Sequence, residues 1–419
     1  MTQRLYALFE KYPAVTTDSR RAGSGTLFFA LRGDRFDGNR FALAALDAGA
    51  ACAVVDDPAV AASAGAEYAG RLVVVDDALA ALQALAREHR RRLGIPLLAI
   101  VGSNGKTTTK ELVSRVLAEK YVIYATHGNL NNHIGVPLTL LSMTRDTELG
   151  VVEMGASACG EIASLCSIAE PNFGIITNVG RAHLEGFGGV EGVRRGKGEL
   201  YDYLASSGGR AFVRRDDPVL VRMAAERGNL AVELYDASIA DGVAHRLEGE
   251  FNRLNVAAAM AVGRYFGVDE ERIRDAIAAY LPENNRSQRQ RTACNTLIVD
   301  CYNANPSSMQ ASLANFLGEE AAGGKVAVLG DMLELGAWSK AEHRAVIEQA
   351  LSGDVERLWL VGAEFAGAWR AMRCADKRVR LFAVCDDAAA VLREEPFTGK
   401  LILVKGSHGI GLERLIGLL

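Results

Sequence analysis

One glycine-rich segment carries the clearest chemistry in this sequence. Gly102-Ser103-Asn104-Gly105-Lys106-Thr107-Thr108 follows the apolar run Leu97–Val101 and precedes a helical pattern. In such a strand–loop–helix, backbone N–H groups and the helix N-terminus bind phosphate. We expect Lys106 to reach the β- and γ-phosphates of a nucleotide and the Thr107 hydroxyl to hold Mg²⁺. The loop is a short GxxGKT form, because Ile100 stands where the longer GxxxxGK[ST] pattern has its first glycine.

Two further side chains follow apolar, strand-like runs. Residues 150–153 end in Glu153, and residues 173–178 lead into a loop that contains His183. Both would lie at the carboxyl edge of a parallel sheet, beside the phosphate loop, where an acid can bind Mg²⁺. The alternative for Glu153 is a helix cap or an ion pair. A lone histidine is more often structural than a ligand, because Mg²⁺ prefers oxygen.

The elements that must position these residues fall into three regions, which we place at residues 1–95, 96–283 and 284–419. In the first region, strands are predicted at 27–31, 51–55 and 72–75, and helices at 41–48 and 78–93. In the second, strands are predicted at 97–101, 121–125, 150–153 and 173–178, and helices at 106–119 and 252–266. In the third, strands are predicted at 297–299, 326–329, 358–361, 379–382 and 401–404. This alternation predicts an α/β fold with mostly parallel sheets covered by helices.

Composition narrows the class of protein. A chain of 419 residues with 49% apolar and 23% charged residues has material for about three folded domains. With 47 basic and 51 acidic residues, the net charge of −4 argues against nucleic acid or an anionic membrane as the main partner. A motor or helicase would need a basic groove, which this balance does not suggest.

Cysteine usage and the apolar runs predict a location. The seven cysteines form no CxxC pair, which is typical of reduced, buried thiols in the cytoplasm. The first residues lack the apolar core of a signal peptide, and no run of about 18 apolar residues predicts a membrane span. We therefore expect a cytoplasmic protein.

Several motifs, in order along nearly the whole chain, resemble those of the Mur ligase family. Besides the phosphate loop, they are 18–20 (DSR), 25–33 (GTLFFALRG), 35–38 (RFDG), 128–137 (GNLNNHIGVP), 153–155 (EMG), 182–188 (AHLEGFG), 300–309 (DCYNANPSSM), 329–336 (LGDMLELG) and 403–407 (LVKGS). Their agreement in order is far more specific than any one of them. Within the family, the central and C-terminal motifs are most similar to the member that adds a dipeptide.

The resemblance implies an ATP-dependent ligase that joins D-alanyl-D-alanine (D-Ala-D-Ala) to UDP-N-acetylmuramoyl-tripeptide (UDP-MurNAc-tripeptide) through an acyl phosphate. It implies an N-terminal domain that binds the UDP-MurNAc-peptide and a central P-loop ATPase domain. A Rossmann-like, doubly wound C-terminal domain would bind D-Ala-D-Ala. ATP, two Mg²⁺ ions and a monomer whose domains close on binding are also expected. Sibling ligases are the alternative, namely the one adding the third amino acid or folylpolyglutamate synthase. A nucleotide-gated binding module without ligase chemistry is a more distant one.

The resemblance also implies a role for individual residues. The catalytic ones are Lys106, His183 and Lys197, and the metal ligands are Thr107, Glu153, His183 and Lys197. ATP would be bound by Gly102, Ser103, Asn104, Gly105, Lys106, Thr107, Thr108, Asn252, Asn255, Arg286 and Asp300. Substrates would be bound by Ser19, Arg20, Gly33, Asp37, Gly38, Asn131, Asn132, Tyr302, Asn305 and Ser407.

Lys197 is the residue for which pattern and resemblance differ most. By sequence pattern it is an ordinary surface lysine, within Arg194-Arg195-Gly196-Lys197-Gly198. The resemblance implies that CO₂ carbamylates it, which turns the ammonium into a carboxylate that a divalent ion accepts. Two departures from the family pattern put local contacts with ATP in doubt. Phe251 replaces the histidine before Asn252, and Glu283-Asn284-Asn285 precedes Arg286 where Pro-Gly-Arg is usual.

Overall fold

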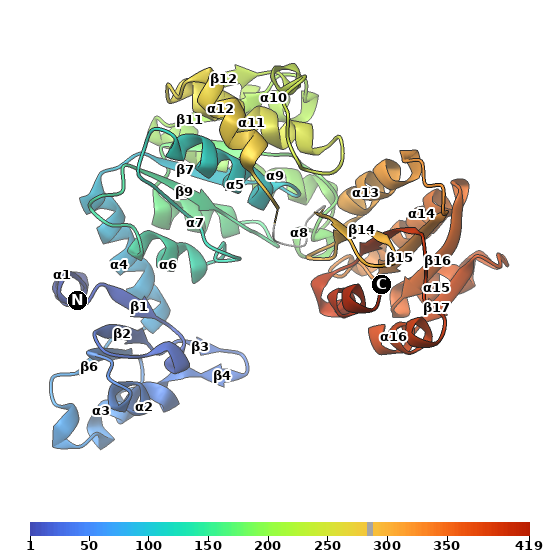
Figure 1. Cartoon of the computed structure of the whole chain (residues 1–419). Helices are drawn as coiled ribbons and strands as arrows, with labels where there is room; N and C mark the ends of the chain where they lie inside the picture. The colour runs from blue at the N-terminus through green and yellow to red at the C-terminus, as the bar shows by residue number, and fades with distance from the viewer. Residues whose placement is uncertain (283–287) are drawn as a thin grey trace.

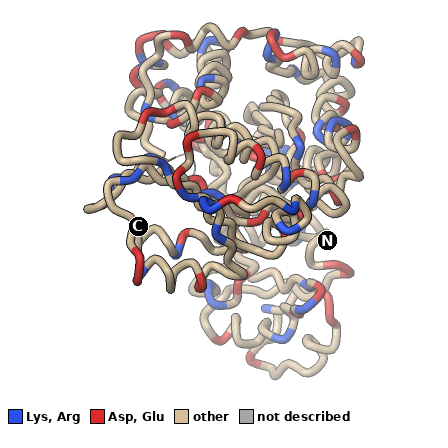
Figure 2. Tube along the Cα trace, turned by 90° about the vertical axis from the view of Figure 1, so that its right-hand side faces the viewer, with Lys and Arg blue, Asp and Glu red and all other residues tan. Residues whose placement is uncertain are grey.

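The computed structural model describes residues 1–282 and 288–419, which fold around three sheets arranged along the chain (Figure 1). The expected α/β class with mostly parallel sheets is confirmed. Among the described residues, no helix is long and apolar enough to cross a membrane. Figure 2 shows acidic and basic residues interspersed along the trace, in keeping with the near-neutral net charge.

The N-terminal sheet is small and entirely parallel. Its strands, in spatial order, are β1 (Ala14–Thr16), β2 (Thr26–Phe29), β5 (Cys52–Val55) and β6 (Leu72–Val74). Around it lie α1 (Thr2–Lys11), α2 (Ala42–Asp47), α3 (Pro58–Ser63) and the hairpin of β3 (Arg32–Gly33) and β4 (Phe36–Asp37). The three strands predicted here are found, and β1 is an additional one.

The central sheet has six parallel strands. In spatial order they are β12 (Ala231–Tyr235), β11 (Arg210–Arg214), β10 (Phe173–Ile176), β7 (Leu97–Val101), β9 (Leu149–Glu153) and β8 (Ile123–Ala125). Because β7 lies between β9 and β10, the loops that follow these three strands meet at one edge. In doubly wound sheets, ligands bind at such a point.

Helices cover both faces of the central sheet, and alternate side chains of β7 pack on each face. One face carries α5 (Lys106–Ala118), α11 (Asn252–Tyr265) and α12 (Glu270–Ala279). The other carries α4 (Ala78–Leu93), α6 (Gly135–Leu141), α7 (Glu161–Ala169), α9 (Val190–Ser207) and α10 (Pro218–Ala225). The short α8 (Leu184–Phe187) leads from the site into α9.

The C-terminal sheet also has six strands. In spatial order they are β13 (Gln288–Arg291), β14 (Thr296–Asp300), β18 (Leu401–Lys405), β15 (Lys325–Gly330), β16 (Val355–Val361) and β17 (Val379–Phe382). Only β13, an edge strand that the sequence did not predict, is antiparallel within this described sheet. α13 (Pro306–Gly318), α14 (Ser339–Ser352) and α15 (Ala363–Met372) cover one face and α16 (Cys385–Glu394) the other. The sheet is doubly wound, as expected.

Candidate active site

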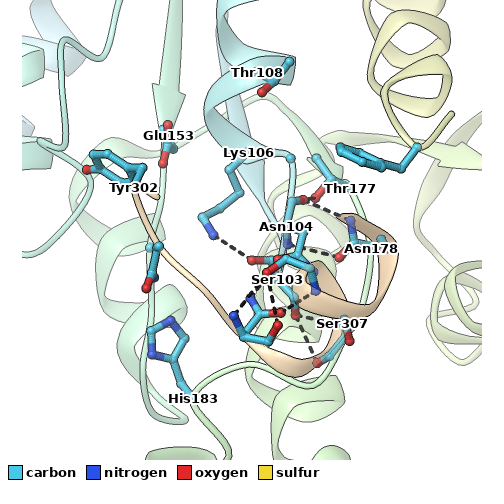
Figure 3. Close-up of a pocket in the computed structure, with 18 of the residues that line it drawn as sticks. Ser103, Asn104, Lys106, Thr108, Glu153, Thr177, Asn178, His183, Tyr302 and Ser307 are labelled. Carbon is cyan, nitrogen blue, oxygen red and sulfur yellow. Dashed lines mark hydrogen bonds between the residues drawn. The ribbon is translucent and has the colours of Figure 1, made fainter. Parts of the chain in front are cut away.

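A cavity of about 810 Å³ lies where the central sheet's carboxyl edge faces the C-terminal sheet (Figure 3). The central part contributes the phosphate loop, the end of β9, the loop after β10 and the start of α11. The C-terminal part contributes the end of β14, the segment after it and the first turns of α13. Segments separated by some 200 positions in the sequence therefore form one cavity.

Close packing around the phosphate loop requires its two glycines. Gly102 has φ +152°, and a Cβ there would lie 1.9 Å from Thr177 Oγ1. Gly105 has φ +77°, and a Cβ would lie 2.5 Å from Asn255 Oδ1. Thr177 Oγ1 in turn donates a hydrogen bond of 2.6 Å to the carbonyl of Asn104. The loop after β10 thus holds the phosphate loop in shape.

Lys106 lies over the phosphate loop at the start of α5 (Figure 3). Its Nζ donates to the carbonyl oxygens of Gly102 at 2.7 Å and Ser103 at 3.4 Å. The ammonium is therefore held at the mouth of the loop, where backbone N–H groups and the N-terminus of α5 favour an anion. This arrangement fits the phosphate contact expected for Lys106.

Glu153, at the end of β9, has an acceptor that no described group satisfies. The side chain is buried, and its Oε1 accepts a 2.8 Å hydrogen bond from Asn131 Nδ2. Its Oε2 is also buried and has no hydrogen-bond partner. A buried carboxylate oxygen without a donor is costly unless a cation or water meets it. Because Glu153 lines the cavity, its donor set fits a Mg²⁺ ligand.

His183 reaches across to the C-terminal part of the site. Its Nδ1 pairs with Glu334 Oε2, and this hydrogen bond lowers the pKa of Glu334 below its ordinary value. Both residues have left-handed backbones, with φ of 51° for His183 and 61° for Glu334. The other two non-glycine residues with positive φ in the described chain are the helix C-caps Glu170 and Arg373. His183 and Glu334, in contrast, do not cap the C-terminus of a helix, so their strained backbones are not explained by helix capping.

Lys197 corrects an expectation from the sequence pattern, since it is buried at 1% exposure and is no surface lysine. It lies on the inner face of α9, where Gly196 allows the Phe187 ring to approach. Its Nζ donates to the carbonyl of Ala156 at 3.0 Å and lies 4.9 Å from the ring centroid of Phe187. Burial, together with the nearby charge of Lys106, lowers the pKa of Lys197 to about 7.

Two amides that were expected to bind ATP, Asn252 and Asn255, also line the cavity. Asn252 Nδ2 donates to the Glu248 carbonyl at 2.6 Å, and Asn255 Nδ2 donates to Asn252 Oδ1 at 2.8 Å. Phe251, which replaces the usual histidine, also lines the cavity. From the C-terminal part, Asp300 pairs with the buried Lys405, and both residues line the cavity.

The structure brings most of the expected residues together, but not all. Lining the cavity are Ser103, Asn104, Gly105, Lys106, Thr108, Asn131, Asn132, Glu153, His183, Asn252, Asn255, Asp300, Tyr302 and Asn305. Gly102, Thr107 and Lys197 are not among the lining residues, although they lie within the elements that form the wall. Ser407 lines an adjoining cavity, and Arg286 lies outside the described residues.

The residues expected to bind the uridine nucleotide lie apart from this cavity. Ser19 and Arg20 form a 3₁₀ turn, and Arg20 makes an ion pair with Asp18 at 2.8 Å. Gly33 and Asp37 belong to the β3–β4 hairpin, and Gly38 begins the 3₁₀ turn that follows. All of them belong to the N-terminal part of the chain, and none is among the lining residues.

Sequence reasoning assigned no role to several residues that shape the site. Asn178 Oδ1 accepts from the Asn104 N–H at 3.1 Å, and Arg181 Nη1 pairs with Glu342 Oε1 at 2.9 Å. Glu334 and Lys405 line the cavity as well. The signal for Asn178 was present, because it ends a predicted strand. Glu334 and Lys405 lie inside quoted motifs, but only the fold shows which side chains of those motifs face inward.

Comparison with known proteins agrees with this architecture. Residues 11–90, 100–263 and 285–408 match the models for "Mur ligase family, catalytic domain", "Mur ligase middle domain" and "Mur ligase, glutamate ligase domain". The UDP-N-acetylmuramoyl-tripeptide–D-alanyl-D-alanine ligase of Bacillus subtilis is 34% identical, over 96% of this chain and 92% of its own length. The ligase of the same name from Escherichia coli K12 is 31% identical, over 96% and 92%.

Solved structures give the same result. MurF from Acinetobacter baumannii superposes with a TM-score of 0.86 at 28% identity, covering 100% of this chain and 98% of that one. MurF ligase from Thermotoga maritima in complex with ADP gives 0.81 at 26% identity, covering 97% and 96%. With relatives above 30% identity over nearly its whole length, the chain belongs to the Mur ligase family.

Proposed function

We propose that this protein is the ATP-dependent ligase that joins D-Ala-D-Ala to UDP-MurNAc-tripeptide. The observation that carries the proposal is the shared cavity, in which a phosphate loop and a buried acid face the C-terminal sheet. Relatives with this activity in their name match the chain over nearly its full length. The phosphate loop suits ATP, and ADP is bound in the related Thermotoga structure.

The reaction needs an activated carboxylate. A free carboxylate does not accept an amine at neutral pH, because the leaving group would be an oxide. Transfer of the γ-phosphoryl group of ATP to the tripeptide's terminal carboxylate gives an acyl phosphate and ADP. The amine of the dipeptide then attacks the carbonyl carbon, and the tetrahedral intermediate expels phosphate. Lys106 and the N-terminus of α5 would neutralise and orient the phosphates during transfer.

Two Mg²⁺ sites belong to the same proposal. Thr107 and Glu153 would hold one ion, and Glu153, His183 and Lys197 the second. The unpartnered Oε2 of Glu153 supports a cation there. Within the described residues, no group of three or more His, Cys, Asp and Glu side chains could hold a metal, so the second site would need an acidic group on Lys197. Bound Mg²⁺ would offset the repulsion between ATP and the carboxylate.

Carbamylation of Lys197 would supply that group. A pKa of about 7 leaves much of this amine neutral at physiological pH, and a neutral amine is the form that reacts with CO₂. The nitrogen forms a bond to the carbon of CO₂ and loses one proton, which gives a carbamate. With ¹³CO₂, we expect a carbamate ¹³C NMR signal in the wild type that is absent from Lys197→Ala. Short carboxylates should partly restore activity to this variant, and full activity without them would overturn the role.

The remaining residues that were expected to bind substrates form two groups, one for each substrate. The N-terminal set, which includes Arg20 and Asp37, would bind the uridine nucleotide. On the same hairpin region, Phe36 and Phe41 are exposed and stacked, with ring centroids 5.5 Å apart, a flat apolar surface that suits a base. The Rossmann-like C-terminal domain, residues 284–419, would bind the dipeptide. The domain boundaries, the monomeric state and the cytoplasmic location remain predictions.

Phosphate release from ATP tests the proposal directly. UDP-MurNAc-tripeptide and D-Ala-D-Ala are each added, omitted or replaced by single amino acids. We expect release only with both substrates, together with a UDP-linked pentapeptide product. Release with diaminopimelate, lysine or glutamate in place of the dipeptide would identify a sibling ligase. Release that needs neither substrate would identify an NTPase and overturn the proposal.

A further inference from the structure

Three consecutive backbone N–H groups in the C-terminal part, those of residues 331–333, each donate to a different element. The first donates to the Val361 carbonyl at the end of β16, the second to His343 Nε2 on α14 and the third to Ser407 Oγ just after β18, each at 3.0 Å. The direction of the chain is therefore fixed from three sides immediately before it reaches Glu334.

Glu334 lies where the C-terminal part meets the central part. Together with His183 it lines both the large cavity and the smaller one that adjoins it. Its side chain pairs with His183, and its carbonyl accepts from the Glu185 N–H at 3.2 Å. Its backbone is left-handed, at φ 61°, and such a backbone persists only where the surroundings dictate it. The three fixed N–H groups before Glu334 therefore help to hold its carboxylate at His183.

His343 makes its contact from outside both cavities. It is fully buried and is not among the residues that line either of them. Because Nε2 accepts from the Met332 N–H, the ring proton is on Nδ1, which donates to the Ser339 carbonyl at 2.8 Å. Phe365 packs edge-on against the ring, with centroids 4.5 Å apart. Burial lowers the pKa of His343, which favours the neutral ring that this contact requires.

The neighbouring acid, Asp331, does not compete for the same nitrogen. Its carboxylate oxygens accept from the N–H groups of Glu364 and Phe365, at 2.9 and 2.8 Å, at the start of α15. Its Oδ1 lies 3.9 Å from His343 Nε2, which is beyond hydrogen-bond distance. Nε2 therefore serves the backbone of Met332 and not the acid.

We propose that His343 is a positioning residue of the active site: its neutral imidazole fixes residues 331–333 and so presents Glu334 to His183. The inference rests on the proposed function for its activity measurements. It adds a residue that lies outside the cavity that would hold the substrates. Without the acceptor at Nε2, the segment would shift, and the Glu334–His183 contact that joins the two parts of the cavity would be lost.

Two substitutions at His343 differ in whether they keep an acceptor. His343→Leu removes it, whereas His343→Gln keeps an amide oxygen that can reach the Met332 N–H. Glu334→Ala removes the contact with His183 directly. Val346→Ala is the matched control, because Val346 is equally buried on the next turn of α14. This control separates a loss of packing from a loss of positioning.

A double-mutant cycle measures the positioning. Glu334→Ala should lower kcat/KM for phosphate release with both substrates about tenfold, the worth of one charge-assisted hydrogen bond. His343→Leu should do the same alone, but cost no more than about twofold when added to Glu334→Ala. Its loss of urea midpoint should be equal in both backgrounds. His343→Gln should recover most of kcat/KM, and Val346→Ala should lower the midpoint while leaving kcat/KM within about twofold.

Ring ¹⁵N NMR of the histidines tests the same proposal without substrates. At neutral pH, we expect His343 to carry its proton on Nδ1 and none on Nε2. The ring signals of His183 should shift in His343→Leu as they do in Glu334→Ala, but not in Val346→Ala. A proton on Nε2 of His343, or unchanged His183 signals in His343→Leu, would overturn the proposal.

The two kinds of measurement separate this inference from the proposed function. If the wild type forms the pentapeptide but the losses of kcat/KM from His343→Leu and Glu334→Ala simply multiply, His343 serves general packing and the positioning role is overturned. If the wild type consumes no dipeptide, the proposed function fails, and the His183 ring signals still decide whether His343 positions Glu334.

Discussion

The two junctions of the central sheet with its neighbours are built from different contacts. On the N-terminal side, α4 packs along α6 and α7 with Leu82 and Leu85 fully buried. Arg90 of the same helix donates to the Ala169 carbonyl at 3.0 Å. On the C-terminal side, α8 meets the 3₁₀ turn of Gly336–Trp338, and polar contacts, among them hydrogen bonds of Ser307 and Asn305, join the two parts.

The polar junction borders the active site. Arg181 donates from its backbone N–H to Ser307 Oγ at 2.8 Å, and Asn305 Nδ2 donates to Asn104 Oδ1 at 2.7 Å. Water can replace such contacts at little cost, whereas separating buried apolar helices is expensive. The comparison indicates that the N-terminal junction serves stability. The C-terminal junction is suited to opening and closing around substrates.

The largest effect on activity is expected at the phosphate loop, beside the polar junction. Lys106→Ala should lower the rate of ATP-dependent phosphate release by roughly 10³-fold, because it removes the ammonium that lies over the phosphate loop. The unfolding midpoint should barely change. Steady-state assays with both substrates and urea unfolding measure the two quantities. Lys120→Ala, at an exposed lysine, is the control, and a loss of less than tenfold in Lys106→Ala would contradict the role.

At the N-terminal junction, a substitution should affect stability more than activity. Arg90→Ala should cost about 2–3 kcal/mol of unfolding free energy, because it leaves buried carbonyls without donors. The specific activity of the folded enzyme should remain close to that of the wild type. Arg91→Ala on the same helix removes only a surface ion pair with Glu170 and should cost much less. Equal stability losses for the two variants would break the comparison.

A smaller effect is expected from loosening the polar junction itself. Arg181→Ala removes the ion pair with Glu342 and should raise the KM for ATP roughly 3- to 10-fold by favouring an open arrangement. Thermal stability should change little. Arg344→Ala, in a surface pair with Glu348 on α14, is the matched control. An unchanged KM for ATP together with a large drop in Tm would assign Arg181 to stability instead.

The smallest expected effect is a pH dependence of stability that arises at the N-terminal junction. Burial lowers the pKa of His89, whose Nε2 contacts the Met143 carbonyl at 2.9 Å. Below its ordinary pKa of about 6.5, the unfolded chain takes up a proton that the folded chain resists. Stability should therefore be complete above that pH and fall as the pH drops toward 5. His89→Gln should flatten this slope in urea titrations, and an unchanged slope would exclude His89 as its source.

Much of the central sheet could be predicted from local pattern. The phosphate loop, β7, β9 and β10 all follow from apolar runs that end in polar, chemistry-bearing residues. The strands that were missed are β3 and β4 of the short hairpin and β1, β11, β12 and β13, which lie at or near the edges of the larger sheets. In the edge strands β12 and β13, charged residues such as Glu233 and Arg291 interrupt the apolar pattern, because one side of an edge strand meets solvent.

Lys197 shows where local pattern fails. Its neighbours in the sequence are arginines and glycines, a pattern that predicts an ordinary surface lysine. Its burial depends on the packing of α8 against α9, which brings Phe187 over the lysine. Burial also lowers its pKa, and no property of the neighbouring residues in sequence indicates that shift.

Local pattern and the order of the motifs were enough to predict the α/β class, the phosphate loop, the acid at the end of β9 and the family. These features depend on residues that are close in the chain or on motifs in a set order. The folded structure was needed to find that Glu334 meets His183, that Asn305 meets Asn104 and that a second cavity adjoins the first. Both side-chain contacts join residues more than 100 positions apart in the sequence. They therefore form only when the packing of whole sheets brings those residues together.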